Sequence, residues 1–159
     1  MGGGAKIVAI GNALAGDDGA GPAALRRLRE RGLPAGVDAV DSGADPLNWL
    51  AELGPADRVV LLDAVDMGLA PGSVRALDPG EGGVAFEGRL SLHGLGVGEA
   101  LGVARRLWPA ATIRVVGIQP QGVEPGSGLS QPVADALDEL VNVALNQVAV
   151  WQKGLREHG

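Results

Sequence analysis

The sequence contains no cysteine. This absence excludes disulfide bonds, thiolate metal sites and a cysteine nucleophile. Histidine occurs only as His93 and the tail residue His158, so a Ser-His-Asp triad would have to use His93, and no serine lies in a recognisable nucleophile motif. Dinucleotide-binding and P-loop glycine motifs are also missing. Aromatic residues make up only 3% of the chain, which argues against a surface on which bases or sugars stack.

Positive charge is scarce. The only lysines are Lys6 and Lys153, and the net charge is -6. Without a basic patch to hold a phosphate backbone, we expect no nucleic-acid partner. Four arginines between Arg26 and Arg31 recur at helical spacing, a pattern that predicts a solvated helix face.

Long apolar runs are missing as well. No run approaches the roughly 20 residues that a membrane-spanning helix needs, and the N-terminus lacks the pattern of a signal peptide. We therefore expect no membrane partner and a cytoplasmic location. The 159 residues, of which 46% are apolar, predict a single globular domain over 1–159 with frayed ends at 1–5 and 153–159. The sequence does not reveal the oligomeric state, and we take a monomer as the working expectation.

Apolar runs alternate with amphipathic segments along the chain. We expect strands over residues 7–10, 37–40, 58–64, 73–77 and 112–117. We expect helices over residues 22–31, 45–53, 94–107 and 131–151, with a glycine- and proline-rich loop over 78–92. Alternating strands and helices of this length predict an α/β fold, a three-layer α/β/α sandwich on a mostly parallel sheet.

Two acids and a histidine lie where the expected elements end or begin. Asp18 follows the first strand, Asp63 ends the third, and His93 precedes a helix. If these two strands are neighbours with crossovers on opposite faces, both acids lie at the switch-point crevice. Carboxylates and imidazole suit Zn²⁺, Ni²⁺ or another borderline divalent ion, and three protein ligands leave a position for substrate or water. The residues therefore predict a divalent-metal site but no particular reaction.

Each of these residues also has a purely structural interpretation. Asp18 could cap the helix that begins near Pro22, and His93 could be a polar residue at a helix start. Asp63 is harder to explain in this way, because a buried acid is costly unless it is paired or ligated. Hydrogen-bonding support for the three residues could come from their polar neighbours Asn12, Asp17, Asp41 and Asp66.

Five short motifs follow one another in an order and spacing that span nearly the whole chain. They are Gly11-Asn12-x-Leu14-x-Gly16-Asp17-Asp18-Gly19-x-Gly21-Pro22, Asp41-Ser42-Gly43, Leu62-Asp63-Ala64-Val65-Asp66, His93-Gly94-Leu95-Gly96 and Gly117-Ile118-Gln119-Pro120. With these motifs the chain resembles the NiFe-hydrogenase maturation endopeptidases, which trim the C-terminal extension from the hydrogenase large-subunit precursor.

The resemblance implies a twisted five-stranded sheet with one antiparallel strand, either 73–77 or its neighbour. It also implies that Asp18, Asp63 and His93 are the metal-binding and catalytic residues. In this family the nickel belongs to the substrate, since the precursor is cut only after nickel loading, and we expect that Zn²⁺ or Cd²⁺ can replace Ni²⁺. The metal would polarise the scissile carbonyl or lower the pKa of a water molecule, with Asp17 or Asp66 as candidate bases.

Two other functions stay open on the sequence. The chain could be a non-catalytic, metal-dependent chaperone or binding module for the same precursor, which would bind it without shortening it. It could also be a metal hydrolase with a different amide substrate, which would hold its own ion tightly. The glycine-rich loop over 80–89 matches nothing in the resemblance, so the sequence does not indicate which hydrogenase is processed.

Overall fold

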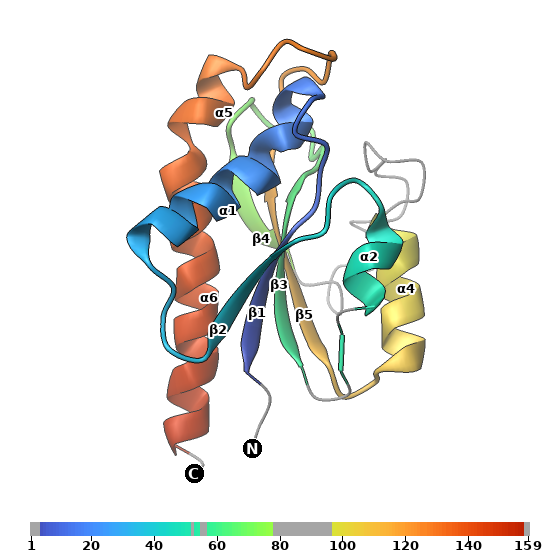
Figure 1. The fold of residues 1–159 in the computed structure, drawn as a ribbon, viewed down its shortest axis with the longest axis vertical. Helices are drawn as coiled ribbons and strands as arrows, with labels where there is room; N and C mark the ends of the chain where they lie inside the picture. Colours follow the sequence, from blue (N-terminus) through green and yellow to red (C-terminus); the bar gives the residue numbers. More distant parts are fainter. Residues whose placement is uncertain (1–3, 52, 55–56, 78–96, 158–159) are drawn as a thin grey trace.

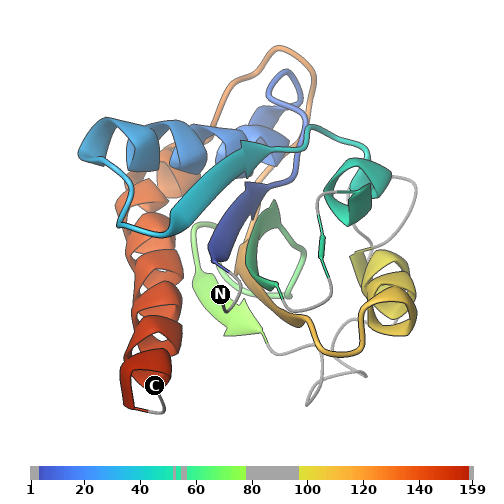
Figure 2. The ribbon, with the colours of Figure 1, turned by 60° about the horizontal axis from the view of Figure 1, so that its bottom comes forward.

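The computed structural model describes residues 4–51, 53–54, 57–77 and 97–157. In these residues a five-stranded sheet has the order β2-β1-β3-β5-β4 and lies between two helix layers (Figures 1 and 2). The strands are β1 (Ala5–Ala9), β2 (Val37–Asp41), β3 (Arg58–Ala64), β4 (Val74–Leu77) and β5 (Thr112–Ile118). All pairings are parallel except that of β4 with β5. The predicted α/β fold, with its antiparallel strand near 73–77, is confirmed.

The helices cover both faces of the sheet. One layer holds α1 (Ala20–Arg31), α5 (Gln131–Asp135) and α6 (Leu137–Glu157), and the other holds α2 (Pro46–Ala51) and α4 (Val97–Leu107). The short 3-10 helix η1 (Gly16–Gly19) precedes α1. Of the expected 94–107 helix, the residues before Val97 lie outside the described part of the chain, as do the loop over 78–92 and its subsegment 80–89.

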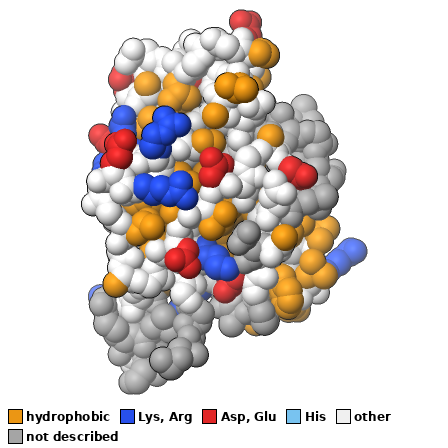
Figure 3. Space-filling view, in the orientation of Figure 1, with side chains coloured by type: hydrophobic (Ala, Val, Ile, Leu, Met, Phe, Trp, Pro, Cys, Tyr) orange, Lys and Arg blue, Asp and Glu red, His pale blue; other side chains and the backbone are white. Residues whose placement is uncertain are grey.

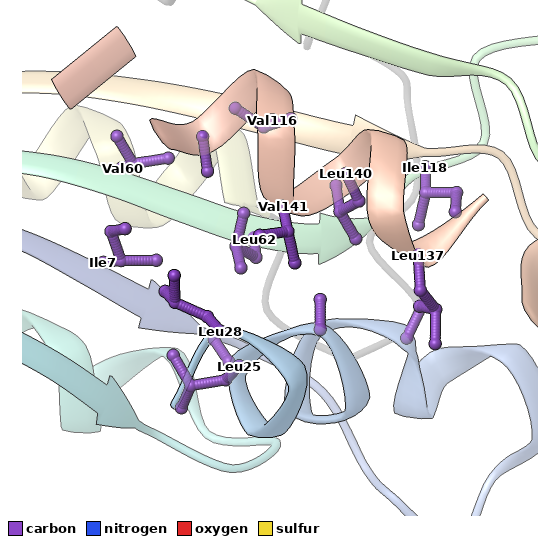
Figure 4. Packing of buried hydrophobic residues seen from close by; sticks show 14 of the residues in the cluster. Ile7, Leu25, Leu28, Val60, Leu62, Val116, Ile118, Leu137, Leu140 and Val141 are labelled. Carbon is purple, nitrogen blue, oxygen red and sulfur yellow. The ribbon is translucent and has the colours of Figure 1, made fainter. Parts of the chain in front are cut away.

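Burial on both faces explains the continuous apolar runs of the central strands. In β3, Val60 and Leu62 join the core under α1 and α6, which Figure 4 shows from close by, whereas Val59 and Leu61 join the core under α2 and α4. Because successive side chains of a strand point to opposite faces, each face takes every second residue. The strand predicted over 58–64 has the same first and last residues as β3.

The long helix predicted over 131–151 is instead two helices. Ala136 separates α5 from α6 with φ -98° and ψ 1°, although the apolar periodicity continues across it. Val133, Leu137 and Leu140 all reach the same core. The start of α5 is held at Ser130 by a carboxylate from another part of the chain, a tertiary constraint that the local periodicity does not contain.

The ordered elements extend into both segments that were expected to fray. At the N-terminus, Ala5 is buried in β1 and its N–H donates to the carbonyl of Gly36. At the other end, α6 continues to Glu157, and the side chain of Gln152 donates to the carbonyl of Ala35. Both contacts are with the connection between α1 and β2.

The arginines of α1 do more than form a solvated face. Arg27 and Arg31 both donate to Asp138 of α6, at 3.1 and 2.8 Å, and Arg31 also donates to Asn142. Arg29 donates to the backbone carbonyl of Ala39 in the edge strand β2. The exposed side of α1 is thus linked to its neighbours on two sides, which helical spacing alone did not reveal.

The order of the strands creates the expected switch point. β1 lies between β2 and β3; the connection from β1 to β2 runs through α1 on one face, and that from β2 to β3 runs through α2 on the other. In such a sheet, ligands bind in the crevice at the carboxyl ends of the two strands. Among the described residues, no helix combines the length and apolarity needed to cross a membrane.

The entry of α1 into this crevice provides a test of the packing. A Cβ atom on Gly21 would lie 2.7 Å from the carbonyl oxygen of Ile10 and 2.8 Å from that of Leu62. We expect Gly21→Ala to lower the free energy of unfolding by about 1–3 kcal/mol, because both contacts are with rigid strand backbone. Urea denaturation measures this change.

The matched control is Gly102→Ala in α4, where an added Cβ meets nothing within 4 Å. It should be neutral or stabilising by up to about 1 kcal/mol, because alanine is the better helix former. Equal effects at the two positions would contradict the packing described for Gly21.

Candidate functional site at the carboxyl end of the sheet

The chain turns sharply after β1. The N–H of Ile10 still donates to Leu62 of β3, and the N–H of Gly11 donates to Gly43. Gly11 has φ +146°, and a Cβ atom there would collide with the carbonyl oxygen of Asp18. Glycine is required because the chain folds back onto itself at this point. The turn brings Asp18 against the end of β1.

Asp18 lies buried in this turn, with 2% of its surface exposed. Its Oδ2 accepts a hydrogen bond of 2.8 Å from the N–H of Asn12. The residue at the N-cap of α1 is Gly19, and no side chain caps the helix there. The interpretation of Asp18 as a helix cap is therefore wrong, and the carboxylate belongs to the loop at the end of the sheet.

Asp63 lies at the end of the neighbouring strand and is fully buried. By the alternation of β3, it points to the face covered by α2 and α4. Its partner in the β5 register is Gly117, where a Cβ would lie 3.3 Å from Val65. Since η1 packs against β3, the segment that carries Asp18 contacts the strand that carries Asp63.

The third predicted ligand, His93, lies outside the described residues. Within the part of the chain that the structure describes, no group of three or more His, Asp or Glu side chains is arranged to hold a metal ion. The convergence of Asp18, Asp63 and His93 on one ion stays a prediction. The two acids have the chemistry that such a site needs, because carboxylate oxygens bind borderline divalent ions.

Asp17 is fully buried and joins its loop to the segment after β5. Its Oδ1 accepts a hydrogen bond of 2.6 Å from the N–H of Ser130. Its Oδ2 accepts bonds from the N–H groups of Gln121 (2.7 Å) and Gly122 (3.1 Å) and from the Ser130 hydroxyl (2.8 Å).

The hydrogen bonds to Asp17 also decide its charge state. Burial alone raises the pKa of this carboxyl, but the bonds from Ser130, Gln121 and Gly122 lower it by more, so the pKa lies below its ordinary value. Asp17 is therefore a poor proton acceptor. It anchors a loop and does not suit the role of catalytic base.

The other predicted supporting residues close turns in their own loops. Asn12 accepts from the N–H of Leu14 at 2.9 Å. Asp41 accepts from the N–H of Gly43 at 3.0 Å, and Asp66 accepts from that of Gly68 at 3.1 Å. Such Asx turns fix the backbone two residues ahead of the polar side chain. Asn12 and Asp66 lie in loops at the carboxyl end of the sheet and Asp41 is the last residue of β2, and the three side chains shape the loops at this edge.

Gln119 connects the loop after β3 to the end of β5, a role that sequence reasoning missed. Its Oε1 accepts from the N–H groups of Met67 (2.6 Å) and Leu69 (3.3 Å), and its Nε2 donates to Asp66 at 3.1 Å. The side chain is 7% exposed. A polar residue directly after the apolar run of β5 was the available signal, because such a residue is buried only when it is bonded.

Two further buried polar groups face the side of the sheet that carries Asp63. Asp41 of β2 and Leu62 of β3 both pair with Ala9 of β1. Ser42 and Asp63 are the next residues along the chain, so both point to the opposite face of the sheet. The Ser42 hydroxyl and the indole N–H of the fully buried Trp49 find no hydrogen-bond partner among the described residues. Such groups cost about 1–3 kcal/mol each. Sequence reasoning gave neither residue a role.

The chain is similar to proteins of one family. A family model described as hydrogenase maturation protease matches residues 22–147. The chain is 34% identical over 149 residues to the hydrogenase expression/formation protein HoxM of Azotobacter vinelandii, which covers 90% of this chain and 71% of that protein. It is 31% identical over 136 residues to the hydrogenase 3 maturation protease of Escherichia coli K12, with 83% of each chain covered.

A solved structure has the same architecture. The hydrogenase maturating endopeptidase HybD from E. coli superimposes with a TM-score of 0.76 over 98% of this chain and 93% of that one, at 26% identity.

The anchoring role of Asp17 predicts a pH-dependent loss of stability. Because its folded-state pKa is depressed, the carboxylate stabilises the protein above the unfolded-state pKa and loses this effect as the pH falls below about 4. We expect Asp17→Asn to lower the free energy of unfolding at neutral pH by about 1–3 kcal/mol. The amide NH₂ of asparagine is a donor, and it would face the N–H and O–H groups that donate to the carboxylate in the wild type. Urea denaturation at several pH values should show the difference from wild type shrinking in acid.

Asp38→Asn is the matched control, because Asp38 is exposed on β2 and its carboxylate makes no hydrogen bond to another described residue. This variant should unfold like the wild type at every pH. A difference between Asp17→Asn and wild type that is constant with pH would contradict the anchoring role.

Proposed function

The chain belongs to the hydrogenase maturation protease family, and we propose that it is the endopeptidase that removes the C-terminal extension of a nickel-loaded NiFe-hydrogenase large-subunit precursor. Relatives at about 30% identity carry the name of maturation proteases, which supports a peptidase. The precursor is the partner, and its bound nickel is part of the substrate.

The single observation that carries the proposal is the placement of two buried acids. Asp18 and Asp63 lie at the carboxyl ends of the neighbouring parallel strands β1 and β3, where this type of sheet binds ligands. We propose that both acids, together with His93, contact the nickel of the precursor. Zn²⁺ or Cd²⁺ would take the same ligands in the isolated protein. An enzyme that recognises the metal ion bound to its substrate should bind little metal by itself.

The metal has one of two roles in this proposal. It either polarises the scissile carbonyl or lowers the pKa of a water molecule that attacks it. A base toward that water must be free to accept a proton, and Asp17 does not suit this role because its oxygens already accept four hydrogen bonds. Asp66 also accepts hydrogen bonds, from Gly68 and Gln119, but it is the exposed one of the two candidate bases and water can therefore reach it.

Cleavage of the precursor tests the proposal. We expect the wild type to shorten the nickel-loaded precursor and to leave the nickel-free precursor intact, as followed by mass spectrometry. Asp18→Asn and Asp63→Asn should each lower kcat/KM by about a hundredfold or more, because each removes a ligand charge from the site. Asp38→Asn again serves as the control and should cleave at the wild-type rate.

Three outcomes would contradict parts of this proposal. Cleavage that survives Asp18→Ala combined with His93→Ala would refute the assigned site. Tight binding of an unshortened precursor by the wild type would instead favour a chaperone or binding module. A purified protein that holds one tightly bound ion and cuts an unrelated amide substrate would favour a metal hydrolase of a different class.

A further inference from the structure

Two leucines at the carboxyl end of the sheet are exposed although their loops are rigidly held. Leu14 has 77% of its surface exposed and Leu69 has 38%. Leu14 belongs to the motif that carries the family resemblance, yet it neither packs in the core nor offers an atom that could bind a metal. An exposed apolar side chain is unremarkable by itself, so the case depends on its surroundings.

The backbone of Leu14 is fixed on both sides. Its N–H donates to the Asn12 side chain at 2.9 Å, and its carbonyl accepts from the N–H of Gly126 at 2.9 Å. The next residue, Ala15, forms an antiparallel bridge with Pro125. Leu14 therefore lies in a loop that is hydrogen-bonded to the segment after β5.

The loop of Leu69 is attached to the same segment. The N–H of Leu69 donates to Gln119, and the preceding N–H of Gly68 donates to Asp66. Residues 119–126 thus form a common base for the loops after β1 and β3. The loop after β1 leads into η1, which carries Asp18, and the loop after β3 follows Asp63, so the leucines flank the proposed site.

Among the described residues, the segments at this edge carry charge of one sign. The four segments over residues 10–19, 41–45, 64–73 and 119–130 contain six acids and no lysine or arginine. Four of the six are exposed: Asp41, Asp45, Asp66 and Glu124. In Figure 3 the basic side chains of this face lie over α1 and α4 and low on the sheet, whereas the upper rim shows acidic and hydrophobic ones.

We propose that Leu14 and Leu69 are the apolar anchors of a docking surface for the hydrogenase precursor, and that the partner surface is apolar with lysine and arginine around it. This inference rests on the proposed function and adds the residues that bind the substrate away from the reacting bond. Burying a side chain whose backbone is already fixed loses little conformational freedom. The four exposed acids around the leucines attract a basic surface and repel an acidic one.

Steady-state cleavage and binding of the nickel-loaded precursor test the docking surface. We expect Leu14→Ala to raise KM about tenfold with kcat unchanged, because contacts that are equal in the bound substrate and the transition state affect only binding. Leu69→Ala should raise KM about threefold, since less of this side chain is exposed and available for burial. Binding by the wild type should weaken as salt is raised.

Two leucine- or valine-to-alanine controls match the exposure of the test residues. Leu33, between α1 and β2, is 38% exposed, and Val150, on α6, is 65% exposed. Leu33→Ala and Val150→Ala should leave KM and kcat unchanged. All four variants should keep the wild-type melting temperature, because none of these side chains is buried.

The outcomes separate this proposal from the proposed function. Cleavage by the wild type with unchanged KM in Leu14→Ala overturns the docking surface alone. A lower kcat at unchanged KM in that variant also overturns it, because the leucine would then act on the reaction and not on binding. Failure of the wild type to cut the nickel-loaded precursor overturns the proposed function, whatever the leucine variants do.

Discussion

The structure at the carboxyl end of the sheet depends on the hydrogen bonds that the Asp17 carboxylate accepts. This carboxylate lies fully buried between the loop after β1 and the segment after β5, and both of its oxygens accept hydrogen bonds. A charged group is stable in such a place only when its bonds replace those of water. Here they do, and the lowered pKa is the consequence. The hydrogen bonds of Asp17 hold Ser130 at the start of α5 and help to position the loop over residues 121–126.

The adjacent acids of η1 therefore have different tasks. Asp17 serves the fold, because the segment after β5 occupies its hydrogen-bonding capacity. Asp18 is held through the N–H of Asn12 in a turn that only glycine permits at residue 11, and it remains at the switch point of the sheet. The distinction is physical: neighbouring carboxylates in one short helix have different partners, since Asp17 accepts hydrogen bonds from the segment after β5 and Asp18 accepts one from Asn12, close to the end of β1.

A protease that trims a precursor protein, as we propose for this chain, has to recognise a surface as well as a bond. Rigid loops with exposed leucines and a rim of acids suit such recognition, because their shape is set before the partner arrives. The hydrogen bonds of Gln119 and Asp17 hold these loops in place. The proposed recognition would thus depend on the same two polar side chains as the local structure, since Gln119 belongs to the segment that follows β5 and Asp17 is hydrogen-bonded to it.

Local patterns in the sequence determined most of the architecture. The apolar run of β3 and the glycine after α1 predicted element boundaries that the structure has, since burial on two faces and a helix end both leave local signatures. Asp18, Asp63 and His93 were predicted from their places at the ends or starts of the expected elements, and the resemblance supplied their roles. Only the tertiary structure decided the break at Ala136, the linkage of α1 to α6 through Asp138, and the separate tasks of Asp17 and Asp18. These depend on which donors approach from residues more than 100 positions away, and no local pattern records such a meeting.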